Sequence, residues 1–129
     1  MGMLDGMVTW FAQAMIGEEV TAFDDSNAYI CVGDSDAEFN SAQTNLQAVT
    51  NKVRVGMDNN FPARVGYELE FQATFGEEVA NWVWKEWGIA NHASAGTLAN
   101  RKVENKGTKN GGSWVLNVKL ALVIGTPPA

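Results

Sequence analysis

YELEFQATF, residues 67–75, is the stretch that decides the fold. Apolar and polar side chains alternate along all nine positions, and the apolar set is Tyr67, Leu69, Phe71, Ala73 and Phe75. A period of two is typical of a β-strand that buries one face and exposes the other. The exposed face here carries the carboxylates of Glu68 and Glu70.

Further strands are predicted on both sides of this one. AYICV, at residues 28–32, is a continuous apolar run of the kind found in strands buried on both faces. Residues 52–57 alternate again, whereas residues 58–66 contain Pro62 and Gly66 and predict a loop. A turn and then a strand are expected over residues 79–87. Residues 98–104 and 113–124 resemble an antiparallel pair joined by the turn-rich ENKGTKNGGS.

Two short helices are predicted in the N-terminal part. Leu4, Val8, Phe11, Ala12 and Met15 recur at steps of three and four, which predicts an amphipathic helix over residues 4–16 that Gly17 ends. Its apolar face needs a partner, either the sheet of this domain or another subunit. Ser35 and Glu38 form a capping box, which predicts a second helix over residues 36–48.

These elements define a mainly β fold, an antiparallel β-sandwich or open barrel of five to seven strands. A chain of 129 residues that is 46% hydrophobic suits one domain with its own core. We expect a single domain over residues 1–129, with a helical arm at residues 1–17 and a β-rich core at residues 28–125.

The charge and the cysteine content limit the kinds of partner and the cellular compartment that we expect for this protein. The net charge is −6, and residues 1–51 hold eight acids and no Lys or Arg, so we expect neither nucleic acid nor a membrane as partner. Cys31 is the only cysteine, which excludes an internal disulfide. The N-terminus lacks the basic region of a signal peptide, so we expect synthesis in a cytosol.

Three groups of residues deserve a chemical hypothesis. Cys31 and His92 are the only thiol and imidazole, and Glu68 and Glu70 have a spacing that suits a glycosidase pair. An apolar strand around the thiol and a solvated face around the glutamates argue against both. The acidic turns at Asp24, Asp25, Asp34 and Asp36 match no calcium loop. We therefore expect no catalytic residue, no metal and no cofactor.

Five tryptophans, at positions 10, 82, 84, 87 and 114, are many for this length. Most of them can be core residues of a small β-domain. Exposed rings would instead form the centre of a protein interface or a platform for sugars.

The segment FGEEVANWVWKEWGIANHASAGTLANRKV, residues 75–103, resembles small virion structural proteins of tailed bacteriophages. Those proteins have a Trp-x-Glu-Trp-Gly-Ile/Val strand, an Asn-Ala-Ala-Ser-Gly-Gly-Thr-like turn and a Leu-x-Asn-Arg strand. The matching residues are Trp84, Glu86, Trp87, Gly88, Ile89, Asn91, Ala93, Ser94, Gly96, Thr97, Leu98, Asn100 and Arg101. His92 and Ala95 depart from that pattern.

The resemblance implies a structural role in the virion and no catalytic residues. We expect a head decoration (cement) protein that binds the major capsid protein or another virion protein. A tail, collar or fibre-base protein is the alternative, and a sugar-binding module using the Trp cluster is a second one. We expect a homo-oligomer, for which a trimer would suit an icosahedral threefold axis. The predicted interface residues are Trp10, Phe11, Met15, Trp82, Trp84, Trp87 and Arg101, although Arg101 can instead pair with Glu86 within the chain.

Overall fold

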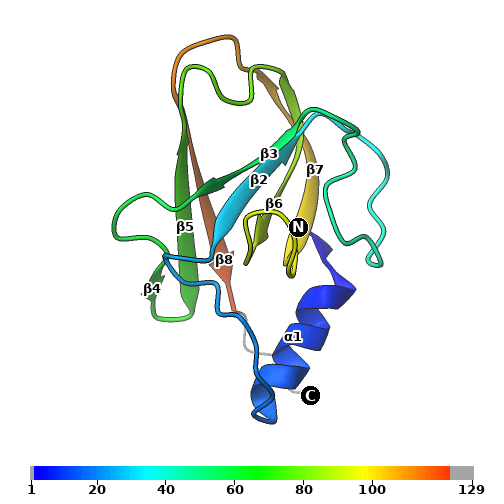
Figure 1. Cartoon of the computed structure of the whole chain (residues 1–129), viewed down its shortest axis with the longest axis vertical. Helices are drawn as coiled ribbons and strands as arrows, with labels where there is room; N and C mark the ends of the chain where they lie inside the picture. Colours follow the sequence, from blue (N-terminus) through cyan, green and yellow to red (C-terminus); the bar gives the residue numbers. More distant parts are fainter. Residues whose placement is uncertain (1, 123–129) are drawn as a thin grey trace, which may run out of the picture.

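A computed structural model describes residues 2–122, and these form a mainly β fold of two antiparallel sheets with one short helix (Figure 1). The predicted fold class is confirmed. Residues 2–122 contain eight strands rather than five to seven, because two very short strands, β1 and β4, add to the count. The elements are β1 (Gly2–Met3), α1 (Asp5–Met15), β2 (Tyr29–Gly33), β3 (Lys52–Gly56), β4 (Ala63–Val65), β5 (Glu68–Phe75), β6 (Val83–Ala90), β7 (Asn100–Thr108) and β8 (Trp114–Ala121).

The larger sheet has the order β1-β7-β6-β2-β3. β2 lies between β6 and β3, which explains why its sequence is apolar on both faces. Ile30 and Val32 face the core between the sheets, and Cys31 is buried on the opposite face with Leu4 and Leu46.

The smaller sheet has the order β4-β5-β8. β5 and β8 pair over eight residues without a register shift, from Glu68 opposite Ala121 to Phe75 opposite Trp114. Phe71, Ala73 and Phe75 are buried against the larger sheet, as the period of two predicts. Ile124, which was predicted for the last strand, lies outside the described residues, as do residues 123–125 of the predicted core.

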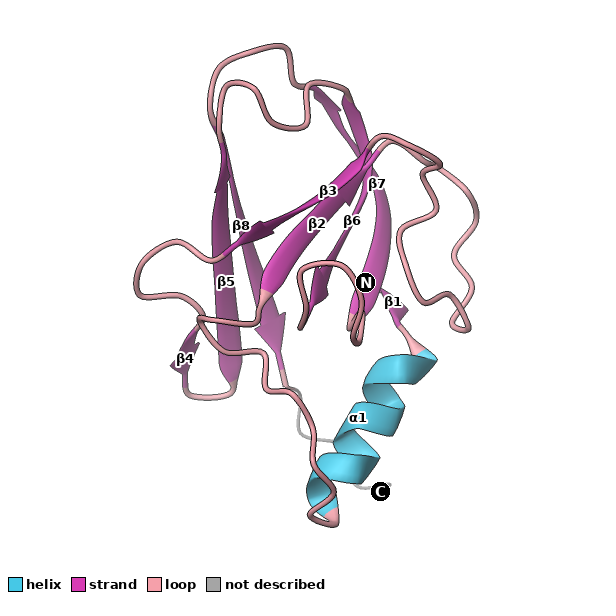
Figure 2. Ribbon diagram, in the orientation of Figure 1, coloured by secondary structure: helices cyan, strands magenta, loops and turns pink. Residues whose placement is uncertain are grey.

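The first helix is confirmed, and it begins at Asp5 and ends at Met15. Gly17 follows with a φ of 83°, a left-handed conformation that costs glycine little. Figure 2 shows α1 outside both sheets, with its C-terminal turn projecting away from the strands. The helix is therefore an appendage to the sandwich rather than a layer of it.

The second predicted helix is wrong, because residues 34–51 form a long loop. Polar side chains take the backbone N–H groups that a helix would use: Ser35 Oγ accepts from Ala37 N, and Asn40 Oδ1 accepts from Ala42 N. These local bonds are the reason that Ser and Asn disfavour helix interiors. Ser35 and Glu38 thus match the capping-box pattern although no helix follows them.

The predicted pairing of the last two strands is also wrong. β7 pairs with β6 and β1, whereas β8 pairs with β5, so consecutive strands lie in different sheets. The segment between them crosses from one sheet to the other instead of forming a hairpin turn. Within the loop predicted at residues 58–66, Ala63–Val65 forms the short edge strand β4.

Candidate binding surface

The solvent-facing side of α1 is the first part of the candidate surface. No residue of this helix is fully buried. Phe11 is 41% exposed and Met15 is 90% exposed, and Val8 and Ile16 are exposed beside them. Large apolar side chains grouped in this way mark contact surfaces for other molecules. The helical face predicted from Val8, Phe11 and Met15 therefore lies largely in solvent.

A different set of side chains holds α1 to the sandwich. Met7 packs against the main core, and the ring of Trp10 meets Phe23 edge-on at a centroid distance of 5.5 Å. Trp10 Nε1 also donates to Thr21 O at 2.9 Å, which ties the helix to the segment that follows it. Leu4, directly before the helix, is completely buried and donates its N–H to Ala99 O.

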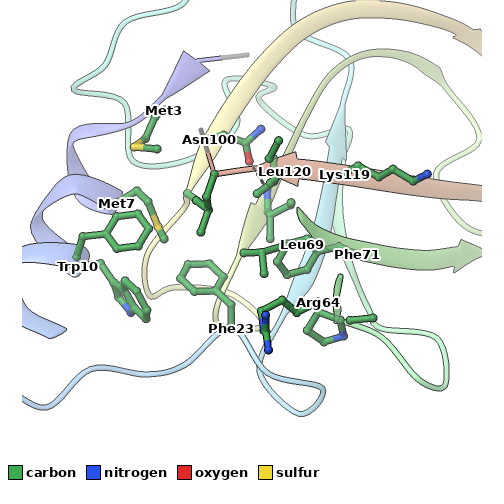
Figure 3. Close-up of a pocket in the computed structure, with 17 residues that line it drawn as sticks. Met3, Met7, Trp10, Phe23, Arg64, Leu69, Phe71, Asn100, Lys119 and Leu120 are labelled. Atoms are coloured by element: carbon green, nitrogen blue, oxygen red, sulfur yellow. Dashed lines mark hydrogen bonds between the residues drawn. The ribbon is translucent and has the colours of Figure 1, made fainter. Parts of the chain in front are cut away.

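An apolar cleft separates α1 from the strands, and we call it the α1 cleft. Its volume is about 610 Å³, within the range of ligand and peptide sites. Figure 3 shows Met7 and Trp10 on the helix side and Leu69, Phe71 and Leu120 on the strand side, with Phe23 between them. Arg64 lies at the edge, and the buried amide of Asn100, whose Nδ2 has no hydrogen-bond partner, lies in the wall.

The tryptophans divide between core and surface. Trp84 and Trp87 are buried, and Trp84 Nε1 donates to Ala80 O at 3.0 Å while its ring packs edge-on against Phe75 and Trp114. Trp84 and Trp87 are thus core residues, and their assignment to an interface is wrong. Trp82 is half-buried and packs against the same core. Without Trp84 and Trp87, the sugar platform loses two of its rings.

Arg101 is also buried, and it pairs with Glu86 on the neighbouring strand. Arg101 Nε lies 2.7 Å from Glu86 Oε1, and both side chains are fully buried. The intramolecular alternative is confirmed, and an interface role for Arg101 is wrong because its side chain is fully buried within the chain.

The catalytic hypotheses find no support in the geometry. Burial raises the pKa of the Cys31 thiol to about 12, against a smaller opposing effect of Arg54, so the thiolate nucleophile is suppressed. His92 Nδ1 accepts hydrogen bonds from Ser94 N and Ala95 N, which fixes the loop around it. Glu70 accepts from Asn117 on the solvated outer face of β5.

The acidic turns have structural partners as well. Asp24 accepts from Ser26 N and Asn27 N, Asp34 accepts from Asn51, and Asp36 lies 3.9 Å from Lys85. Among residues 2–122, no three His, Cys, Asp or Glu side chains gather in a way that would hold a metal ion.

The comparisons with known proteins add no family. The chain matches no family model and no curated protein sequence. No helix within residues 2–122 has the length and hydrophobicity needed to span a bilayer. The candidate surface is therefore defined by its own geometry.

The predicted contact residues include part of this surface. Trp10 and Phe11 line the α1 cleft, and Met15 lies on the exposed face of the helix. Met7, Phe23 and Leu120 of the cleft were not predicted. The signal for Met7 was its position three residues before Trp10, on the same helical face. Phe23 and Leu120 come from segments far apart in the sequence, and only the tertiary fold brings them to α1.

Proposed function

We propose that this chain is a non-enzymatic structural protein of a tailed-bacteriophage virion that decorates the outer surface of the head. The observation that carries the proposal is α1, a helix with exposed apolar side chains and an apolar cleft beside it. The resemblance of residues 75–103 to small virion proteins supplies the class of partner. Trp10, Phe11 and Met15 are the contact residues that this proposal retains.

Charge around the helix indicates the chemistry of the partner. Asp5 lies in the first turn of α1, and Glu18 and Glu19 follow its end. All three are exposed, and the chain has no basic residue before Lys52. An apolar patch flanked by acids favours an apolar partner surface bordered by Lys or Arg. The contact should weaken as ionic strength rises, because exposed charges are screened by salt.

The test is co-sedimentation with purified heads of the phage that encodes the protein. Met15→Asp places a carboxylate at a side chain that is 90% exposed, so the folded chain tolerates it. We expect this variant to lose most head binding while its circular dichroism stays that of the wild type. Phe11→Asp should act in the same direction.

Val49→Asp is the matched control. Val49 is 95% exposed and lies in the loop at residues 34–51, so it tests an apolar-to-acid change elsewhere on the surface. Equal binding by Met15→Asp and wild type would contradict the role of α1. Wild-type protein that binds isolated tails and ignores heads would contradict head decoration and favour the tail or collar alternative.

A further inference from the structure

One long strand of the molecule has a free edge. β8, at Trp114–Ala121, pairs with β5 on one side and, within residues 2–122, with no strand on the other. An unpaired edge presents backbone donors and acceptors to any strand that approaches it. The pairing of β8 with β5 is unbroken over eight residues, so this edge contains no bulge.

The hydrogen bonds identify which backbone groups point outward. Leu122 N donates to Tyr67 O at 2.8 Å, on the β5 side. Backbone groups alternate in direction along an antiparallel strand, so the even-numbered residues of β8 bond to β5. The N–H and C=O groups of residues 115, 117, 119 and 121 therefore point to the free edge.

The other sheet edges are protected. β1 and β4 have only two and three residues, too few to template a strand. β3 carries Lys52 and Arg54, and just past it Asp58 N donates to Gln72 O of β5. Beyond its pairing with β1, the outer edge of β7 carries the charged residues Lys102, Glu104 and Lys106. β8 has no proline, no bulge and one charge, Lys119.

We propose that β8 pairs antiparallel with β8 of a second copy of this chain, joining the two small sheets into one six-stranded sheet. The register must keep the apolar face of each strand toward its own core. A twofold axis at Asn117 achieves this, with Val115 opposite Lys119 of the other copy and Leu116 opposite Val118. This register also keeps the two Lys119 ammonium groups apart, whereas an axis at Val118 would place them on a close diagonal. The C-terminal half of this edge borders the α1 cleft, whose lining includes Lys119 and Ala121. The pairing uses the backbone of β8 and does not depend on the proposed virion role.

Lys119→Pro tests the backbone pairing. Its N–H points to the free edge, so proline removes an intermolecular hydrogen bond and leaves the β5 pairing intact, as edge strands tolerate. We expect light scattering over micromolar to millimolar concentrations to show a dimer for the wild type and a monomer for Lys119→Pro. Lys119→Ala is the control, because it removes the charge and keeps the N–H, and it should still dimerise.

Val115 tests the register, because its side chain is 58% exposed and can be changed without disturbing the monomer. Val115→Lys opposes Lys119 of the other copy, and Val115→Glu pairs with it. We expect Val115→Lys to raise the dissociation constant of the dimer and Val115→Glu to lower it, both relative to the wild type. The two constants should differ by about fivefold or more, because each dimer contains the pair twice. Equal shifts in both variants would overturn the register.

Amide exchange of the monomer and dimer completes the test. The amides of residues 115, 117, 119 and 121 should gain protection as protein concentration rises, whereas those of 116, 118 and 120 are protected throughout. A wild type that stays monomeric at millimolar concentration would overturn the proposal. A dimer that persists in Lys119→Pro and disappears in Met15→Asp would also overturn it, because α1 would then form the contact.

Discussion

At the scale of single residues, the Glu86–Arg101 pair anchors a long loop to one face of the larger sheet. Glu86 accepts from Gln47 N at 2.7 Å and Ala48 N at 2.9 Å, and Arg101 donates to Ala37 O at 2.9 Å. One buried ion pair thus holds both ends of the loop at residues 34–51. Buried charges are tolerated because their partners are charged and their remaining hydrogen bonds are filled.

Removal of one partner from this pair should lower the stability of the folded protein substantially. We expect Arg101→Met to lower the free energy of unfolding by about 3–5 kcal/mol, because Glu86 is then buried without a counter-charge. Denaturant unfolding measures the loss, and amide exchange at Gln47 and Ala48 should rise with it. Lys85→Met removes the exposed pair with Asp36 and should change stability by less than about 1 kcal/mol. Similar losses in the two variants would argue that the buried pair has no special role.

The Cys31 thiol should be inert in the folded protein. With a pKa of about 12, only about one thiol in ten thousand is ionised at pH 8, and it is also shielded from reagents. We expect a thiol reagent to label Cys31 at the rate of unfolding. Because the folded-state pKa exceeds that of an unfolded thiol, the contribution to stability is full below about pH 8.5 and declines as pH rises above it. Rapid labelling of native protein at pH 8 would contradict the buried position, and Cys31→Ala should remove the label.

At the scale of elements, the residues that carry the phage resemblance build the β6–β7 unit. Asn91 Oδ1 accepts from Thr97 N and its Nδ2 donates to Thr21 O, while Asn100 Oδ1 accepts from Ile89 N. Gly96 has a φ of 69° in the turn between the strands. Asn91 and Asn100 are buried, whereas Ala93, Ser94 and Gly96 in the connecting turn are exposed. The buried part of the motif therefore holds β6 and β7 together, and its turn is open to solvent.

Gly88 of β6 faces the backbone of β7 with no room for a side chain. A Cβ atom at residue 88 would collide with Asn100 O, which belongs to the backbone and cannot rotate away. We expect Gly88→Ala to destabilise the protein by about 3 kcal/mol or more, measured by thermal or denaturant unfolding. Gly76→Ala is the control, because space around Gly76 is open and its φ is not left-handed. It should change stability by no more than about 0.5 kcal/mol. A stable Gly88→Ala variant would contradict this strand spacing.

Local sequence patterns predicted strands well and their connections less well. The period of two around Phe71 and the apolar run at Ile30 follow from burial of known faces, so both strands were predictable. The helix at residues 36–48 failed because contacts from Glu86 and Arg101, far away in sequence, stabilise a loop there. The pairing of β7 and β8 failed for a similar reason. Lys109 in the predicted flexible turn is completely buried and donates to Gly76 O and Asn81 Oδ1, which directs the chain to the other sheet.

At the scale of the whole molecule, the two sheets differ in size and α1 does not close the space between them. The five-stranded sheet contributes Ile89 and Asn100 to the α1 cleft, and the three-stranded sheet contributes Leu69 and Leu120. The helix that could fill this space instead exposes Phe11 and Met15. The sequence predicts the helix and its need for a partner, but local spacing does not determine whether that partner is the same chain.

The open cleft should be detectable without knowing the natural partner. An anionic fluorescent dye that binds apolar surfaces should bind the native protein, because the α1 cleft is apolar, has a volume of about 610 Å³ and has Arg64 at its edge. Phe11→Asp places a charge in the cleft wall and should lower the dye signal by about half or more, since the apolar area at the mouth falls. Val49→Asp should leave the signal unchanged, and circular dichroism should confirm that both variants are folded. Native protein that binds no dye would show that the cleft is closed in solution, and the contact role of α1 would then rest on its exposed face alone.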